Sequence, residues 1–232
     1  MNVHLELFGC EGGSAFGYAR AFQNEREVWS VDNAPARHAL NPYRWHLGDW
    51  KTGLERALAT GRVVSIGASP PCHVNSRGTA AIDRSGYPDL IAPVRDALVT
   101  TGLPYIIENV EDARRKMIEP LRLCGTEFGL ETHDTNGMAL WLKRHRLFES
   151  NVPLENNGGC SHPKDKRCAG VYGGARRDSE EARLVRKGGY VPKNVEVLRR
   201  LLRAPAWMSE QGMFLSIPPA YTEHLGRQLL AL

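Results

Sequence analysis

Two hydrophobic patterns alternate through the first two thirds of the chain. Short β-branched and aliphatic runs predict strands over 4–8, 27–31, 62–67 and 103–107. Between them, apolar residues recur every three or four positions, which predicts helices over 14–22, 35–40, 51–60 and 89–101. Strands that alternate with helices are typical of an α/β fold with a mostly parallel central sheet. We therefore expect functional side chains at the carboxyl ends of these strands, where open α/β sheets bind their ligands.

The alternation stops near residue 151. From there to 189 the chain is rich in Gly, Asn, Lys, Arg and Pro, which predicts a small loop-rich insert. Helical spacing returns over 194–202 and 220–230. The predicted organisation is a main domain over 1–150, a basic insert over 151–203 and a segment over 204–232 that returns to the main domain.

The composition is that of a globular protein, with 42% hydrophobic and 24% charged residues among 232. No apolar run is long enough to span a membrane, and the first residues lack a secretory leader, so we expect a cytoplasmic protein without membrane contact. Between residues 143 and 203 there are 15 Lys and Arg against 7 Asp and Glu, whereas the remaining residues carry 15 against 19. This asymmetry favours a polyanionic partner for the insert, although a charge run can also be a solvated face.

A glycine-rich turn lies between the first predicted strand and helix. It runs from Phe8 to Gly13, and such turns bring backbone amides close to a ligand. Asp32 ends the next strand, where an acid can accept hydrogen bonds from ribose hydroxyls. Asp49 is a second candidate acid, with a helix N-cap as its alternative. The pattern indicates a nucleoside cofactor, with a tight connection as the alternative for the glycines.

A candidate nucleophile follows the third predicted strand. Pro70 and Pro71 hold the chain extended before Cys72, which is either a positioned nucleophile or an incidental buried thiol. Glu108 ends the neighbouring strand and offers a carboxylate beside that thiol, with a helix cap as its alternative. Arg144 and Arg146 lie two positions apart, so on a strand they would share one side.

In this order the motifs resemble those of the DNA (cytosine-5)-methyltransferases, in particular the compact bacteriophage and prophage type, and the resemblance runs from Phe8 to Arg227. It implies a Rossmann-like methyltransferase fold with a target-recognition insert and S-adenosyl-L-methionine as cofactor. The implied catalytic residues are Cys72, Glu108, Arg144 and Arg146. The implied cofactor-binding residues are Phe8, Gly9, Glu11, Gly12, Gly13, Asp32, Asn33, Asp49, Trp50 and Ser216.

The resemblance also implies a reaction. The Cys72 thiolate would add to C6 of a cytosine flipped out of double-stranded DNA, and C5 would then accept the methyl group. No obligate protein partner is expected. Three positions depart from the family's usual residues, namely Cys10 in place of Gly, His73 in place of Gln and Leu142 in place of Gln. These departures affect the surroundings of the thiol rather than the thiol itself.

Several alternatives stay open at this point. Ser69-Pro70-Pro71 also occurs in amino-methyltransferases, but there an aromatic residue stands where this chain has Cys72. An RNA cytosine-C5 methyltransferase would use the same chemistry, and a silent DNA-binding relative would keep the fold alone.

A metal site is a further alternative. Cys160, His162 and Cys168 are zinc-type ligands that would need Cys124 or His133 as a fourth. Because no second close pair exists, the sequence favours incidental thiols and no metal.

Overall fold

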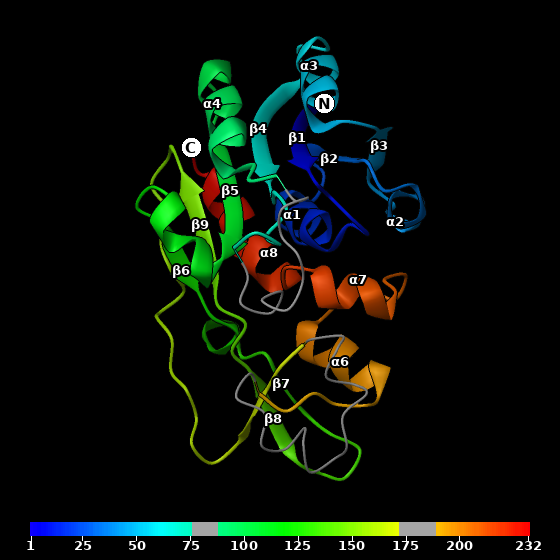
Figure 1. Cartoon of the computed structure of the whole chain (residues 1–232), viewed down its shortest axis with the longest axis vertical. Helices are drawn as coiled ribbons and strands as arrows, with labels where there is room; N and C mark the ends of the chain where they lie inside the picture. Colours follow the sequence, from blue (N-terminus) through cyan, green and yellow to red (C-terminus); the bar gives the residue numbers. More distant parts are fainter. Residues whose placement is uncertain (76–87, 172–188) are drawn as a thin grey trace.

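A seven-stranded sheet forms the centre of the computed structural model, which describes residues 1–75, 88–171 and 189–232 (Figure 1). Its strands are β1 (Asn2–Leu7), β2 (Arg26–Asp32), β3 (Arg44–Leu47), β4 (Val63–Ala68), β5 (Tyr105–Val110), β6 (Leu121–Leu123) and β9 (Arg146–Ser150). The first five pair in parallel, whereas β9 is antiparallel to both β5 and β6. The predicted α/β fold with a mostly parallel sheet is confirmed.

The strand order β3-β2-β1-β4-β5-β9-β6 places a switch point between β1 and β4. From β1 the chain builds outward through β2 and β3, and from β4 it builds the other way. The loops that leave β1 and β4 therefore diverge and leave a crevice at the carboxyl ends of the strands. The glycine turn follows β1 and the Cys72 loop follows β4, so both candidate motifs border this crevice.

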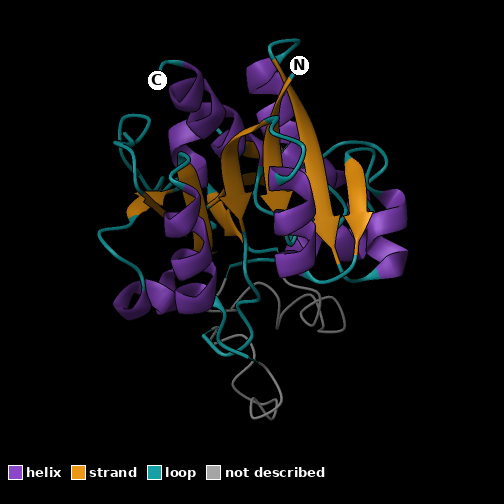
Figure 2. Cartoon of the chain, turned by 90° about the horizontal axis from the view of Figure 1, so that it is seen from above, coloured by secondary structure: helices purple, strands orange, loops and turns teal. Residues whose placement is uncertain are grey.

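Helices cover both faces of the sheet (Figure 2). They are α1 (Gly13–Phe22), α2 (Pro35–Leu40), α3 (Trp50–Leu58), α4 (Ile91–Thr101) and α8 (Pro219–Leu230). Strand β1 shows how alternation divides the core. Val3, Leu5 and Leu7 pack into the apolar cluster that includes α3 and α4. On the other side His4 and Glu6 are buried and bond to one another, with 3.0 Å between Nε2 and Oε1.

Helices α1 and α8 pack closely although they are far apart in the sequence. A Cβ atom on Gly17 would lie 2.0 Å from Thr222 Oγ1, and one on Gly226 would lie 2.7 Å from Ala21 Cβ. The Thr222 hydroxyl donates to the carbonyl of Ser14 at 2.9 Å, across 208 positions of the chain. The glycines therefore permit a close approach that larger residues would prevent.

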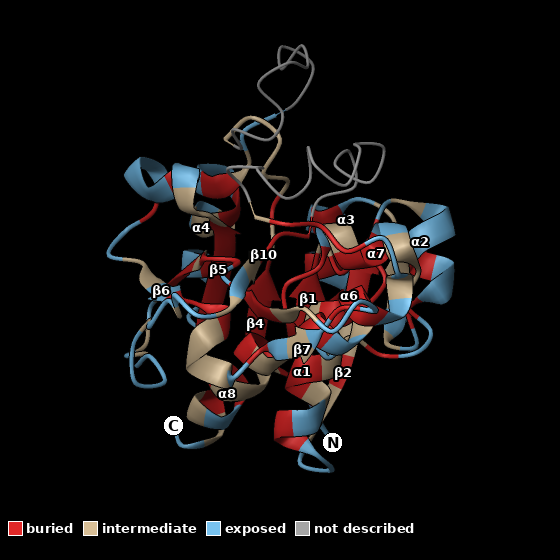
Figure 3. Ribbon diagram, turned by 90° about the horizontal axis from the view of Figure 1, so that it is seen from below, coloured by how far each residue is buried: buried red, intermediate tan, exposed pale blue. Residues whose placement is uncertain are grey.

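A smaller layer lies beyond the carboxyl ends of the strands (Figure 1). It contains the three-stranded sheet β10-β8-β7 and two helices. Its elements are β7 (Glu131–His133), β8 (Ala139–Leu142), β10 (Arg167–Ala169), α6 (Val195–Leu202) and α7 (Glu210–Leu215). Its apolar residues share one core cluster with α1 and α8, so this layer is packed onto the main domain. In the main domain, burial differs between the elements: strand β5 is largely buried, whereas most residues of helix α2 are exposed (Figure 3).

Most predicted elements are present with small changes at their ends, and α2 has the predicted bounds. Three differences matter for the site. Glu108 and Asn109 lie within β5 rather than at its end, and β9 begins only at Arg146. The helix that Glu108 was considered to cap is the 3-10 helix η2 (Glu111–Lys116). The sheet of the smaller layer joins β10 to β7 and β8, which precede the boundary predicted at residue 151.

Among the described residues, none of the helices combines the length and apolarity of a membrane span.

Candidate active site

The Cys72 loop is fixed from the neighbouring strand. Asn109, on β5, donates from Nδ2 to the Pro70 carbonyl at 3.1 Å and accepts from the Val110 amide at 3.0 Å. Beyond the prolines, the Asn75 amide donates to the Cys72 carbonyl at 2.9 Å and closes a turn. Asn109 was not among the predicted site residues, although its place directly after Glu108 is the signal that could have found it. The half-buried thiol is therefore held on a rigid loop rather than a free one.

Glu108 and Arg146 form an ion pair next to this loop. Arg146 Nε lies 3.0 Å from Glu108 Oε1, and β9 presents Arg146 opposite Val110 of β5. Burial raises the pKa of the Glu108 carboxyl, although Arg146, Arg144 and a hydrogen bond from Ser69 act in the opposite direction. A carboxyl with a raised pKa can carry a proton and donate it to a ring nitrogen. Ser69, which the sequence placed only in the Ser69-Pro70-Pro71 motif, is thus a contact of the Glu108 carboxyl.

The Cys72 thiol is close enough to both charged groups for them to affect its ionisation. Burial raises the pKa of this thiol and the Glu108 carboxylate raises it further, whereas Arg146 and Arg144 lower it. The neutral thiol is therefore the resting form, and formation of the thiolate depends on the two arginines and on a bound substrate. The structure brings Cys72, Glu108 and Arg146 together, in accordance with the sequence prediction.

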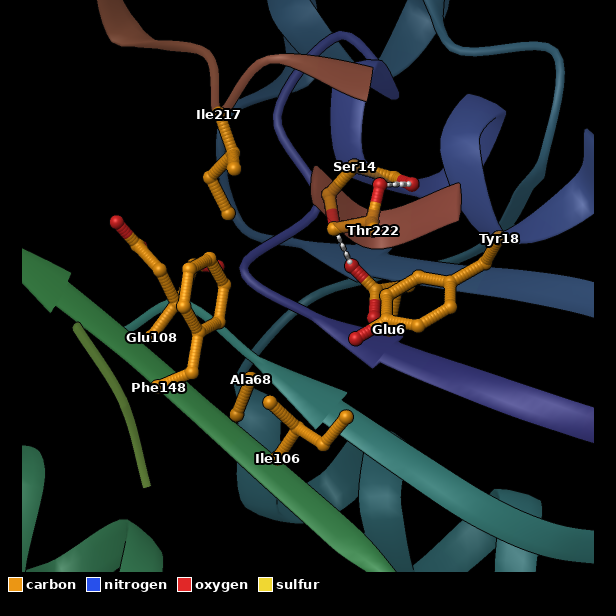
Figure 4. A pocket seen from close by; sticks show the side chains of 10 residues that line it. Glu6, Ser14, Tyr18, Ala68, Ile106, Glu108, Phe148, Ile217 and Thr222 are labelled. Carbon is orange, nitrogen blue, oxygen red and sulfur yellow. Dashed lines mark hydrogen bonds between the residues drawn. The ribbon is translucent and has the colours of Figure 1, made fainter. Parts of the chain in front are cut away.

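A small cavity extends from Glu108 into the core between the sheet and α1 (Figure 4). Glu108 and Phe148 line one side, and Glu6, Ser14 and Thr222 line the other. The Ser14 hydroxyl donates to Glu6 Oε2 at 2.6 Å, so the polar wall is already hydrogen-bonded. This cavity connects the candidate chemistry with the start of α1, where the glycine turn ends.

Arg144 lies outside β9, which corrects the prediction that it shares one side of a strand with Arg146. Its backbone has φ of 29° and precedes β9, so strand alternation does not apply to it. The buried guanidinium donates to the carbonyls of Ser216 at 3.0 Å, Val171 at 3.1 Å and Phe214 at 2.9 Å. All three guanidinium nitrogens are thus bound to backbone oxygens. Arg144 ties together three segments of the chain instead of facing the crevice.

The glycines of the turn are required by packing. A Cβ atom on Gly9 would lie 1.8 Å from Ser30 Oγ, and one on Gly13 would lie 2.3 Å from Ser216 Oγ. Gly12 has φ of 84°, a left-handed conformation that favours glycine. The turn is therefore pressed against β2 and against the segment around Ser216. The Ser216 hydroxyl itself donates to the Ile217 carbonyl, and its cofactor contact stays a prediction.

A hollow beside the turn has the features of a nucleoside site. It is lined by Phe8, Val31, Asp32, Asn33, Gly48 and Trp50. The rings of Phe8 and Trp50 lie 5.9 Å apart between centroids, which provides apolar walls for a base. Asp32 accepts from the Cys10 amide and from the Ala34 amide, each at 2.8 Å. Each carboxylate oxygen can accept a second bond, so Asp32 fits a ribose while it also fixes the turn.

Two of the predicted cofactor residues have other partners. The buried Glu11 carboxylate accepts from the Ser209 amide at 2.7 Å and from its hydroxyl at 2.6 Å, which attaches the turn to the start of α7. Its side chain thus holds the fold rather than facing the hollow. Asp49 is exposed and accepts from the Lys51 amide at 2.9 Å, so the alternative of a helix N-cap is confirmed for it.

The fold matches that of solved methyltransferase structures. No family model matches the chain, and no curated protein matches it. Among solved structures, the Dnmt2 methyltransferase of S. pombe has a TM-score of 0.60 at 13% identity, covering 100% of this chain and 99% of that one. A putative DNA modification methyltransferase encoded within an E. coli prophage has a TM-score of 0.61 at 11% identity, with 100% and 99% covered.

A third structure, the Entamoeba histolytica methyltransferase EhMeth, has a TM-score of 0.55 at 8% identity, covering 100% of this chain and 98% of that one. At such identities the likeness establishes the fold, over the whole length of the chain. The sheet, its strand order and the crevice therefore have the arrangement of the Rossmann-like methyltransferases, as predicted.

Proposed function

We propose that this chain is an S-adenosyl-L-methionine-dependent methyltransferase that acts on C5 of cytosine in DNA. The observation that carries the proposal is the fixed Cys72 loop beside the Glu108 and Arg146 pair, at the same end of the sheet as a nucleoside hollow. Cys72 stands at the position where an exocyclic amino-methyltransferase needs an aromatic residue to stack on the base. Covalent activation of a cytosine ring accounts for a cysteine there.

The residues that would hold the cofactor are Phe8, Asp32, Asn33 and Trp50, around the hollow. S-adenosyl-L-methionine supplies an electrophilic methyl group when it is bound. Asp32 orients the ribose, and the aromatic rings enclose the base and exclude water from it. The fit rests on the apolar walls and on the acceptor capacity left on Asp32.

The chain's own residues provide the activation of the cytosine. The Cys72 thiolate forms a bond to C6 while Glu108 donates a proton toward N3, so the electron pair of the C5–C6 bond becomes available at C5. After C5 has taken the methyl group, it loses its proton to solvent, and the sulfur–carbon bond breaks to restore the thiolate and the C5–C6 double bond. N3 then returns its proton to Glu108, which restores the starting state of both residues. Arg146 keeps Glu108 in place and stabilises negative charge near the thiol.

A mechanism-based substrate tests this proposal. Duplex DNA with 5-fluorocytosine at the target should form a stable adduct with the wild-type protein, because fluorine cannot leave as the C5 proton does. Bisulfite sequencing of DNA from expressing cells first identifies the target context. Cys72→Ala should abolish adduct and methylation, while Cys168→Ala is the matched control that retains both.

The outcomes separate the alternatives. Methylation that survives Cys72→Ala would contradict the cytosine-C5 reaction. Incorporation of labelled methyl groups into RNA but not DNA would favour the RNA methyltransferase, and cofactor binding without any transfer would favour a silent relative.

A further inference from the structure

Four side chains of metal-ligand type meet at the junction of the main domain and the insert. They are Cys124, His145, Cys160 and His162, and each offers one ligand atom within 4.8 Å of all the others. Cys124 follows β6, His145 directly precedes β9, and Cys160 and His162 lie in the loop after β9. Three separate stretches of chain thus converge on one point. This set differs from the one considered from sequence, because Cys168 and His133 are not part of it.

The spacing of the ligand atoms matches a tetrahedral zinc ion. For zinc–nitrogen and zinc–sulfur bonds of ordinary length, two nitrogens should lie about 3.3 Å apart, and a nitrogen and a sulfur about 3.6 Å apart. The two Nε2 atoms of His145 and His162 are separated by 3.3 Å. Cys124 Sγ lies 3.5 Å from His162 Nε2, and Cys160 Sγ lies 3.5 Å from His145 Nε2. Of these four distances, the one between Cys160 Sγ and His162 Nε2, 3.1 Å, departs most from the ideal.

The surroundings also have the form expected around a zinc ligand. A ligating histidine usually donates its second ring N–H to a carboxylate, which fixes the ring and strengthens the ligand. His145 Nδ1 lies 3.0 Å from Glu111 Oε2, so Nε2 is left to face the cluster. The Thr126 hydroxyl donates to Cys124 Sγ at 3.2 Å and would support a thiolate. His162 stacks on Trp141, with 5.0 Å between centroids, which holds its ring in place.

We propose that Cys124, His145, Cys160 and His162 bind one zinc ion as a structural site. Four protein ligands complete the tetrahedron and leave no position for water or substrate, which is the arrangement of structural rather than catalytic zinc. Two thiolates balance the charge of the ion, so the site is neutral beside the basic side chains of Lys143 and Arg122. An incidental thiol cluster would not need the carboxylate on the far side of His145.

The zinc site would connect the insert to β9, the strand that carries Arg146. His145 lies between Arg144, which bonds to the carbonyls of Val171, Phe214 and Ser216, and Arg146, which pairs with Glu108. The ion would fix the start of β9 from one side and the entry of the insert from the other. This inference does not depend on the proposed function, because it concerns metal content and stability.

The wild-type protein provides the first test and needs no substitution. Protein purified without added metal or chelator should retain about one zinc per chain through gel filtration. After removal of zinc, Co²⁺ should give the visible absorption of a tetrahedral ion and a near-ultraviolet charge-transfer band from thiolate. Folded protein that retains no zinc and gives neither band would overturn the proposal, as would a disulfide between Cys124 and Cys160.

Matched variants provide the second test. Cys160→Ser should lose the bound zinc and the charge-transfer intensity of one thiolate. Cys168→Ser, which changes a half-buried thiol outside the cluster, should retain both. Glu111→Gln should keep the ligands but weaken zinc binding by about tenfold or more, since it removes the carboxylate behind His145. Equal zinc content in Cys160→Ser and Cys168→Ser would also overturn the proposal.

Discussion

Two regions of the molecule each hold a cysteine in a defined position, but the side chains around the two thiols differ in kind. Cys72 lies beside a carboxylate and a guanidinium, on a loop that Asn109 holds from β5. Cys124 is buried beside a second thiol and two imidazoles, at the junction with the insert. The first setting combines a proton donor with a positive charge near one sulfur. The second gathers soft ligands around a common point.

The difference shows that the neighbours of a thiol, rather than the thiol itself, define its chemistry. Charged hydrogen-bonding neighbours favour transfer of protons and attack on an electrophile. Nitrogen and sulfur neighbours at tetrahedral spacing favour a bound ion. Substitutions in the two regions should therefore affect different properties of the protein.

The largest contrast is expected from the two cysteines. Cys72→Ala should reduce methyl transfer by at least about 10³-fold, because no covalent bond to C6 can form, and it should leave thermal stability nearly unchanged. Cys124→Ser should instead lower the free energy of unfolding by about 2 kcal/mol or more, because a buried ligand is lost. Single-turnover assays and thermal denaturation measure the two effects. Equal effects of both variants on stability would contradict the distinction.

Arg144 and Arg146 allow a second comparison between an effect on stability and an effect on activity. Arg144→Ala should lower the free energy of unfolding by about 3 kcal/mol, because three backbone carbonyls lose a charged donor. Arg146→Ala should reduce turnover by about 10²-fold and change stability by less than about 1 kcal/mol, because Glu108 can take up a proton when its partner is removed. Denaturant titration and kinetics on the same preparations separate the two. A stable Arg144→Ala variant would show that its bonds are dispensable.

A smaller effect is expected in the nucleoside hollow. Asp32→Asn should weaken S-adenosyl-L-methionine binding by about 1 to 3 kcal/mol, because a charged acceptor for the ribose is lost. Asp49→Ala should leave affinity nearly unchanged and lower stability by about 1 kcal/mol, as expected for the loss of a helix cap. Calorimetry measures the affinities. Equal losses of affinity in Asp32→Asn and Asp49→Ala would indicate that Asp49 also contacts the cofactor.

The smallest effect concerns the basic insert and its salt dependence. Lys164→Ala should reduce the slope of log affinity for DNA against log salt by about 0.9 if the exposed ammonium contacts one phosphate. Lys166→Ala should change the slope less, because its Nζ lies 2.5 Å from Glu131 Oε2. Identical slopes for wild type and Lys164→Ala would mean that this face is only solvated. Arg176 and Arg177, two further candidates, lie outside the described residues.

Much of the fold could be predicted because the main domain has strong local periodicity. The strands β1, β2 and β4 are rich in aliphatic and β-branched residues, and α2 begins with Pro35, which is favoured in the first turn of a helix. Strands β6, β7 and β10 have three residues each, too few to show any period. Helix α7 was missed for a similar reason, since its six residues cover less than two turns.

The candidate site was predictable where local sequence determines geometry. Two prolines and the end of β4 were enough to identify Cys72. The prediction that Arg144 shares one side of a strand with Arg146 was wrong because β9 begins only at Arg146, and no local signal marks the positive φ of Arg144. The metal alternative named Cys160, His162 and Cys124 but included Cys168 in place of His145, because the ligands of the cluster come from three separate stretches of chain. The pairing of β6 with β9, in which Leu123 lies opposite Arg146, brings Cys124 next to His145.

The contact between α1 and α8 has a consequence for the synthesis of the protein. The first helix leaves the ribosome early, but Tyr18 and Phe22 are covered in the same core cluster as Tyr221 and Leu225. Until those later residues emerge, the nascent chain carries an uncovered aromatic face on α1, next to the glycine turn. Contacts this distant in sequence slow folding. We therefore expect the glycine turn to reach its final form only after α8 has been translated.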